Sequence, residues 1–345
     1  MQPNSVPPPL RVSLFSLGIG AIGAGLAWSL SMPAPIIVGP ALLVSIVGIA
    51  GVRVHVDDRI RNVCFVLLGV GIGAGFDPNA SAAILHWPLA FVTLAVGLFA
   101  TMLISRITLT RMFGFDHRSA VLAAAPGHLS FVMSLAETTG TDIGKIALAQ
   151  STRLLALTLI VPFVAQAMGY PLRNIGAMGG PPMMLWELVV LSAGGVAVGL
   201  VFHRLKIPAP LLMGCMAVSG LTHVTSQIDG GVPSWILTPA FMTLGTVIGT
   251  RFSGMTRADA KGALLAGVTI TVIAAIVAVL TAAPVAYMLG MPVAHVLVAF
   301  APGGLETMIA LGAVLKADPG FVAACHIMRL VILIGLIPLM LGRQP

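Results

Sequence analysis

Apolar residues dominate this chain in long runs that short polar stretches separate. A run of about 20 apolar residues is long enough to cross a bilayer as an α-helix. The pattern therefore predicts helical segments throughout, with shorter segments between the longer ones. In the first part of the chain they are residues 12–32, 36–51, 63–76, 82–107, 119–138 and 143–168, and later residues 211–224, 264–289 and 321–341.

Two of the apolar stretches contain a proline followed by glycine. Pro126 and Gly127 interrupt the segment 119–138, and Pro302 and Gly303 interrupt a later one. Proline lacks the backbone N–H and clashes with the preceding helical turn, while glycine accepts unusual dihedral angles. Within a bilayer such a break is tolerated only where protein or a water-filled cavity satisfies the freed backbone groups. We expect the helix to stop at both points.

The two breaks belong to a longer internal repeat. When Pro126 is aligned with Pro302, residues 123–154 match residues 299–330 at eleven of 32 positions without a gap. The repeat predicts four parts in the chain, of which two are membrane repeats. These are a disordered lead (1–10), a first repeat (11–168), a linker (169–187) and a second repeat (188–342).

The basic residues indicate how the two repeats are oriented. The stretch 53–61 carries three Arg, whereas its counterpart 222–234 carries neither Lys nor Arg. Conversely, residues 204–206 carry two basic residues where the turn at Ser31 carries none. Because Lys and Arg favour cytoplasmic loops, equivalent loops are expected on opposite sides. The predicted fold is an all-α polytopic membrane protein of two inverted-topology repeats, each with five to six hydrophobic segments and a broken helix.

An inverted repeat requires an odd number of crossings in each half. Six segments per half therefore leave two alternatives: one short segment is re-entrant, or the linker crosses the membrane. The sequence does not choose between them.

Composition supports a membrane protein and excludes other classes. Hydrophobic residues make up 58% of the chain, charged residues only 8%, and the mean hydropathy is +1.04. The formal charge of +7 comes from basic residues scattered singly, which argues against a nucleic-acid partner. Three cysteines and eight histidines are dispersed, so neither a disulfide framework, a metal site nor a bound cofactor is expected.

A basic residue lies deep in each repeat. Arg153 and Arg329 are placed eleven residues into their segments, which is about 16 Å at 1.5 Å per residue. An arginine at mid-membrane costs about 2.5–3.5 kcal/mol on insertion scales and needs a partner. Two partners stay open: an anionic substrate, or carbonyls freed by the breaks. Gln150 and His326 lie one turn earlier on the same helix faces.

The half-helices that follow the breaks should direct free N–H groups and a positive dipole end inward. Glu306 lies on the second of them and either carries a coupling ion (H⁺ or Na⁺) or merely caps the helix or pairs with Arg329. Asp142 and Asp318 are expected to cap the next helices. The predicted solute site comprises Pro126, Gly127, His128, Ser130, Gln150, Arg153, Pro302, Gly303, Gly304, Glu306, Thr307, His326 and Arg329.

The double motif resembles a known family. The pattern Ala-Pro-Gly-x-Leu, then Asp-x-Gly, then Arg occurs in both halves, with Pro-Ala-Pro upstream at 33–35 and 208–210. Over residues 12–341 it is similar to the AbrB family of bacterial membrane proteins, which is named for an internal duplication. More distantly, the broken helices resemble bile-acid symporter and cation–proton antiporter folds, although the paired in-membrane aspartates of those antiporters are missing.

The resemblance implies a multi-pass protein of the bacterial inner membrane, whose relatives carry labels as regulators of gene expression and as ammonia monooxygenases. A secondary transporter of a small anionic solute, working by alternating access, agrees best with the inverted repeat and the polar midplane. A membrane regulator, acting directly or through metabolite levels, is the alternative. A monooxygenase would need clustered metal ligands, so no enzyme activity is expected. The lipid bilayer and the solute are the expected partners, and a homodimer is left open.

Overall fold

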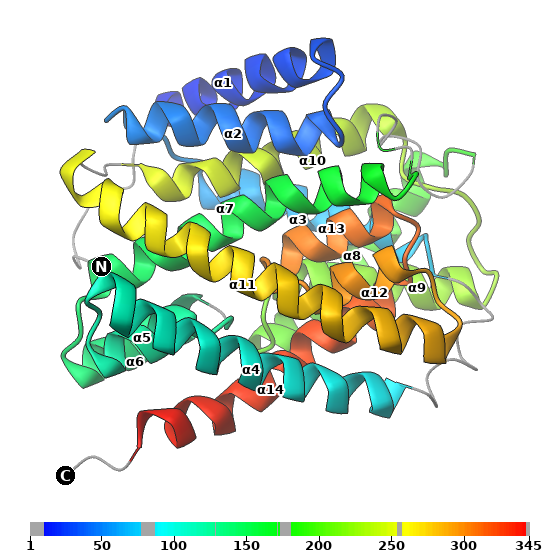
Figure 1. Ribbon diagram of the computed structural model, residues 1–345. Coiled ribbons are helices and arrows are strands. Elements are labelled where there is room, and N and C mark those ends of the chain that lie inside the picture. Colours follow the sequence, from blue (N-terminus) through cyan, green and yellow to red (C-terminus); the bar gives the residue numbers. More distant parts are fainter. Residues whose placement is uncertain are drawn as a thin grey trace.

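The computed structural model describes residues 10–76, 87–127, 129–170, 172, 181–253 and 257–342. Over these residues the protein is all-helical, with fourteen α-helices (Figure 1). Six of the described helices are long and apolar enough to cross a membrane, which makes the chain a multi-pass membrane protein. They are α1 (Leu10–Ser29), α4 (Trp87–Phe113), α7 (Ile143–Ala167), α8 (Leu185–Arg204), α11 (Arg257–Leu289, apolar from Leu264) and α14 (Pro319–Leu341).

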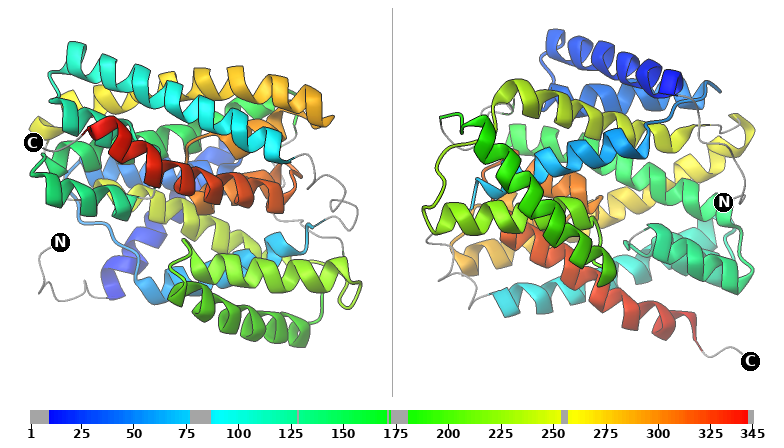
Figure 2. Two further views of the ribbon diagram at one scale, coloured as in Figure 1. Left: turned by 90° about the horizontal axis from the view of Figure 1, so that it is seen from below. Right: turned by 180° about the vertical axis from the view of Figure 1, so that it is seen from behind.

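The helices form two bundles, and each bundle takes helices from both halves of the chain. The first bundle consists of α1, α8, α2 (Pro35–Ile49), α3 (Asp58–Gly73), α9 (Pro210–Val224) and α10 (Ser234–Gly249). In it α2 packs on α10 and α3 on α9, while α8 lies against α9 at the periphery (Figure 2). The second bundle consists of α4, α7, α11, α14, α5 (His117–Ala124), α6 (Leu129–Thr139), α12 (Val293–Phe300) and α13 (Leu305–Val314).

Glycines allow the helices of the first bundle to approach closely. A Cβ atom on Gly69 of α3 would lie 2.5 Å from the carbonyl oxygen of Leu212 on α9. A Cβ atom on Gly245 of α10 would collide with the backbone of Ile37 on α2. Small residues at such crossings are typical of helix contacts in lipid, where close backbone approach replaces the hydrophobic effect.

Both predicted helix breaks are confirmed. Helix α5 ends at Ala124 and α6 begins at Leu129, and α12 ends at Phe300 and α13 begins at Leu305. The predicted segments 36–51 and 211–224 are helices as well, and each begins one residue earlier, at Pro35 and Pro210.

At the second break the chain turns back on itself. The ring Nε2 of His295, near the start of α12, hydrogen-bonds the carbonyl oxygen of Leu315, just past the end of α13, at 3.0 Å. The outer ends of α12 and α13 therefore lie together, as in a helical hairpin. In Figure 1, α5 and α6 likewise lie side by side at the left, whereas α12 and α13 lie at the right.

Helices at corresponding positions in the two halves run in opposite directions. The colours of Figure 1 show α4 running from right to left and its neighbour α11 from left to right. Helix α7 runs from left to right, and α14 runs the other way. Helices α7 and α14 begin at equivalent sequence positions. Their first residues, Ile143 and Pro319, are paired by the same gap-free alignment that pairs Pro126 with Pro302.

Some predicted boundaries differ from the observed ones. Helix α3 begins at Asp58, within the basic stretch 53–61 and before the predicted segment 63–76. The earlier start follows from Asp57, which caps the helix by accepting a hydrogen bond from the Arg59 N–H at 2.8 Å. Helix α8 begins at Leu185, slightly before the predicted start of the second repeat. Residues 1–9 of the predicted disordered lead and residues 171 and 173–180 of the predicted linker lie outside the described residues. Leu10, which was assigned to the lead, begins α1.

Candidate functional site

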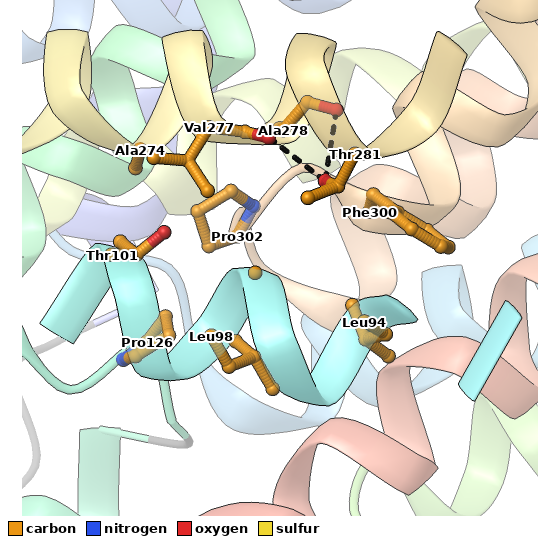
Figure 3. A pocket seen from close by; sticks show the side chains of 11 residues that line it. Leu94, Leu98, Thr101, Pro126, Ala274, Val277, Ala278, Thr281, Phe300 and Pro302 are labelled. Atoms are coloured by element: carbon orange, nitrogen blue, oxygen red, sulfur yellow. Dashed lines mark hydrogen bonds between the residues drawn. The ribbon is translucent and has the colours of Figure 1, made fainter. Parts of the chain in front are cut away.

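The two breaks meet between α4 and α11. Pro126 and Pro302 line one small pocket together with apolar residues of these helices, among them Leu98 and Val277 (Figure 3). Its volume is about 10 Å³, which is at most the space of a single water molecule. The breaks therefore approach each other, but the space between the prolines is too small for a solute.

A larger and more polar cavity lies beside the second break. We call it the second-break cavity; its volume is about 120 Å³, far above the roughly 10–15 Å³ that one water needs. The first bundle contributes Pro208, just before α9, and Arg251, in the short 3₁₀ helix η2 (Thr250–Phe252) that follows α10. The second bundle contributes the other lining residues, which are Gly127, Leu154, Gly303, Gly304, Leu305, Glu306, His326, Arg329 and Leu330.

Arg329 joins the second break to the cavity. The side chain is only 4% exposed, and its Nη1 donates to the Ala301 carbonyl at 3.1 Å and its Nη2 to the Gly303 carbonyl at 3.3 Å. These carbonyls belong to the break. Its Nε–H has no partner among the described residues, and the residue also lines the cavity. The two hypotheses for this arginine are thus compatible, because it holds freed carbonyls and borders a cavity at once.

Arg153 makes the equivalent contacts at the first break. Its Nη1 donates to the carbonyls of Ala124 at 3.5 Å and Ala125 at 3.3 Å, and its Nη2 to that of Ala125 at 3.4 Å. Gln150 assists through Nε2, which donates to the Leu122 carbonyl at 2.8 Å. Neither Arg153 nor Gln150 lines the second-break cavity. In the first half this polar pair therefore holds the break.

His326 borders the cavity with one ring nitrogen unused. Its Nδ1 lies 2.9 Å from the carbonyl oxygen of Val322, and since a carbonyl only accepts, Nδ1 carries the hydrogen. The side chain is 1% exposed, and Nε2 has no partner among the described residues. In the neutral ring Nε2 is a hydrogen-bond acceptor, so the cavity wall holds an unsatisfied buried acceptor.

Glu306 lies in the first turn of α13, after the N-cap residue Gly304. The ion pairs among the described residues are Arg61–Asp58 and Lys145–Asp142, so Glu306 does not lie within ion-pair distance of Arg329. Arg251 borders the same cavity from the first bundle. The hypothesis that Glu306 pairs with Arg329 is therefore not supported, because the Nη atoms of Arg329 are directed to the break carbonyls.

The remaining predicted residues take other positions. Thr307 is buried and does not line the second-break cavity. His128 and the side chain of Ser130 lie outside the described part of the chain. The predicted caps are confirmed: Asp142 accepts from the Lys145 N–H at 3.1 Å, and Asp318 accepts from the Gly320 N–H at 2.7 Å.

Five residues that line the cavity were not predicted from the sequence: Leu154, Leu305 and Leu330, which are chain neighbours of predicted residues, and Pro208 and Arg251 from the first bundle. The counterpart of Arg251 in the first half, Gly75, carries no charge. Pro208 belongs to the Pro-Ala-Pro motif at 208–210, which by itself predicts no site. Nothing in the local pattern marks either residue, because the packing of the first bundle on the second brings them to the break.

The described ranges contain no candidate metal site. There, no three His, Cys, Asp or Glu residues come together in a way that could hold a metal ion. Cys64, Cys215 and Cys325 are free thiols.

Comparison with known proteins identifies the family. Residues 8–343 match the family described as "Transition state regulatory protein AbrB". The chain belongs to the AbrB family. It is 27% identical over 292 residues to "Uncharacterized protein YhjN" of Bacillus subtilis (strain 168), a match that covers 79% of this chain and 75% of that protein. It is 23% identical over 303 residues to "Putative regulator AbrB" of Escherichia coli (strain K12), covering 87% of this chain and 86% of that protein. This AbrB-family membrane protein thus has bacterial relatives along most of its length.

Proposed function

We propose that this AbrB-family protein is a secondary transporter of a small anionic solute, and that the second-break cavity is its binding site. The observation that carries the proposal is the cavity itself, because both bundles supply charged residues to it: Arg251 from the first, and Glu306 and Arg329 from the second. A polar cavity where two bundles meet, beside a break in a helix, is typical of secondary transporters.

The donors around the cavity favour an anion. Arg251 and Arg329 are cationic, and the Nε–H of Arg329 has no partner among the residues that the structure describes. The N-terminus of α13, at Gly304, adds backbone N–H groups and the positive end of a helix dipole. A guanidinium matches a carboxylate in geometry as well as in charge, which a lysine ammonium does not. A small carboxylate therefore fits the lining better than a cation or a neutral solute.

The arrangement of the helices supports inverted repeats. If the hairpins α5–α6 and α12–α13 enter the membrane without crossing it, each half crosses five times, through α1, α2, α3, α4 and α7 and through their counterparts. An odd number inverts the second half, in agreement with the opposite directions of α4 and α11. Rocking of one bundle against the other would then expose the cavity to each side of the membrane in turn.

Glu306 is the candidate for coupling to an ion. It is the one carboxylate that lines the cavity within the described chain, so it can bind H⁺ or Na⁺ as the solute binds. The regulatory name of the relative in Escherichia coli fits this scheme as well, since a transporter that changes the concentration of a metabolite changes gene expression indirectly. The proposal includes no enzymatic reaction.

Counterflow in proteoliposomes tests the function. Purified protein is reconstituted, the vesicles are loaded with one unlabelled carboxylate, and entry of the same labelled carboxylate is followed. We expect saturable exchange for at least one small monocarboxylate, and no exchange for matched neutral alcohols or amines. Exchange of a cation or a neutral solute, with none of any carboxylate, would overturn the proposal.

The inverted topology has its own test. Met112 and Met288 are exposed at the ends of α4 and α11, and they are counterparts in the alignment that pairs Pro126 with Pro302. With the three native cysteines replaced, Met112→Cys and Met288→Cys should react with an impermeant thiol reagent from opposite sides of the membrane. Labelling of both from the same side would contradict the inverted repeat.

A further inference from the structure

We infer that the solute of the second-break cavity is a small 2-hydroxy monocarboxylate. This inference rests on the proposed function and narrows its substrate class. It combines three observations: the balance of charges around the cavity, the unused acceptor of His326, and the volume.

The charge balance indicates a single negative charge. Two arginines, Arg251 and Arg329, face one carboxylate, Glu306, so the lining carries one positive charge in excess. A monoanion neutralises that excess, and it would do so beside Arg329, where burial makes an uncompensated charge costly. A zwitterionic amino acid brings no net charge and leaves the excess uncompensated. A dicarboxylate brings two negative charges and would leave the site with an excess negative charge instead.

The ring of His326 has an acceptor atom that a hydrogen-bond donor on the solute would satisfy. Its Nδ1–H is engaged with the Val322 carbonyl, and the lone pair of Nε2 has no partner among the described residues. His326 lies one turn before Arg329 on the same face of α14, and side chains at this spacing are neighbours. A carboxylate bound by Arg329 would therefore have His326 as a neighbour. A hydroxyl group on the carbon next to the carboxylate would then offer a donor to Nε2 without adding charge.

The volume limits the size of the solute. About 120 Å³ accommodates a compact molecule and favours short acids over long-chain or aromatic ones. Acids of two or three carbons with one hydroxyl group fit this space and carry one charge and one donor. The three observations therefore converge on the same chemical class.

Matched pairs of ligands test the inference on the full-length protein. Isothermal titration measures the dissociation constants of glycolate against acetate and of lactate against propionate, with alanine as the zwitterion of the same skeleton. We expect each hydroxy acid to bind about tenfold tighter than its partner, the factor that one additional hydrogen bond in a buried site supplies. Alanine should bind more weakly than lactate.

The role of His326 is separated by a pair of variants. His326→Phe keeps an aromatic ring but removes the acceptor, and it should reduce the hydroxy preference to about one. Gln150→Leu is the matched control, because Gln150 holds the equivalent position at the first break and does not line the cavity. The control should keep the tenfold preference. If His326→Phe does not fold, His326→Leu and the ratios of the native protein decide the question.

Each contrary result has a distinct meaning. Equal binding of both members of each pair by the native protein would overturn the hydroxy inference, while the transporter proposal would stand. Tightest binding of alanine would overturn the charge argument. A preference unchanged in His326→Phe would remove His326 from the site and overturn the inference. Failure of every monocarboxylate both to bind and to exchange in proteoliposomes would overturn the proposed function itself.

Discussion

Arg153 and Arg329 are counterparts in the duplicated sequence and hold the two helix breaks in the same way, yet only Arg329 borders the second-break cavity. Each guanidinium donates to carbonyls that its own break has freed, which compensates for removing both groups from water. The equivalence explains why both arginines are buried. The difference is why we propose the binding role for Arg329 and not for Arg153.

The charge of Glu306 should oppose binding of an anion. Glu306→Gln keeps the size of the side chain and removes a negative charge from the cavity lining. We expect the affinity for a monocarboxylate, measured by isothermal titration, to rise about fivefold or more at low ionic strength. Weaker anion binding in the variant would contradict this electrostatic role.

If Glu306 also carries the coupling proton, the same variant should change transport differently from binding. Uptake in proteoliposomes should lose its dependence on external pH, although the solute binds more tightly. Uptake with an unaltered pH profile would show that another group carries the ion, or that uptake is uncoupled.

The close contact at Gly69 should tolerate no side chain. A methyl group there would lie 2.5 Å from the Leu212 carbonyl oxygen, and the backbone of α9 cannot yield easily. Gly69→Ala should therefore lower the free energy of unfolding by about 3 kcal/mol. Gly18→Ala is the control, since a Cβ atom there would meet nothing within 4 Å, and it should be neutral or slightly stabilising. Thermal unfolding in detergent measures both, and equal stability of the two variants would contradict the packing.

The helix cap at Asp116 should make stability depend on pH. Partial burial raises the pKa of Asp116, but hydrogen bonds led by that from Ser119 outweigh it, so the pKa of this carboxyl is lowered overall. A lowered pKa in the folded state means that the ionised cap stabilises the protein at neutral pH. That stabilisation is lost as the pH falls through the folded-state pKa.

Asp116→Asn provides the comparison, because asparagine still caps the helix but does not titrate. We expect the native protein to be the more stable at pH 7 and the difference in melting temperature between the two to shrink as the pH falls. A difference that stays constant between pH 7 and pH 3 would contradict the assignment.

The sequence predicted the breaks because their cause is local. A proline followed directly by glycine inside an apolar run favours a helix stop, so the interruptions at Pro126 and Pro302 could be recognised from the local sequence. Proline alone does not decide it, since Pro162 and Pro338 lie inside continuous helices. The caps at Asp142 and Asp318 followed in the same way, since a cap depends on the next few residues alone.

The location of the cavity could not be predicted from the repeat. The two halves share the motif that ends in Arg153 and Arg329, so the motif alone treats both breaks as equal. What distinguishes them is Arg251, which the first bundle brings to the second break and which has no charged counterpart. Such contacts between distant segments depend on helix packing, and no local spacing encodes them.

The central claim is that Arg329 binds the solute and Arg153 does not. Both lysine variants should lose comparable stability, because each replaces a guanidinium that holds several carbonyls with a single ammonium group. Only Arg329→Lys should also lose binding.

Isothermal titration of a bound monocarboxylate against the native protein, Arg329→Lys and Arg153→Lys tests this claim most directly. We predict at least tenfold weaker binding for Arg329→Lys, and an affinity within about twofold of the native protein for Arg153→Lys. Native affinity in Arg329→Lys, or an equal loss in both variants, would contradict the assignment of the second-break cavity as the site.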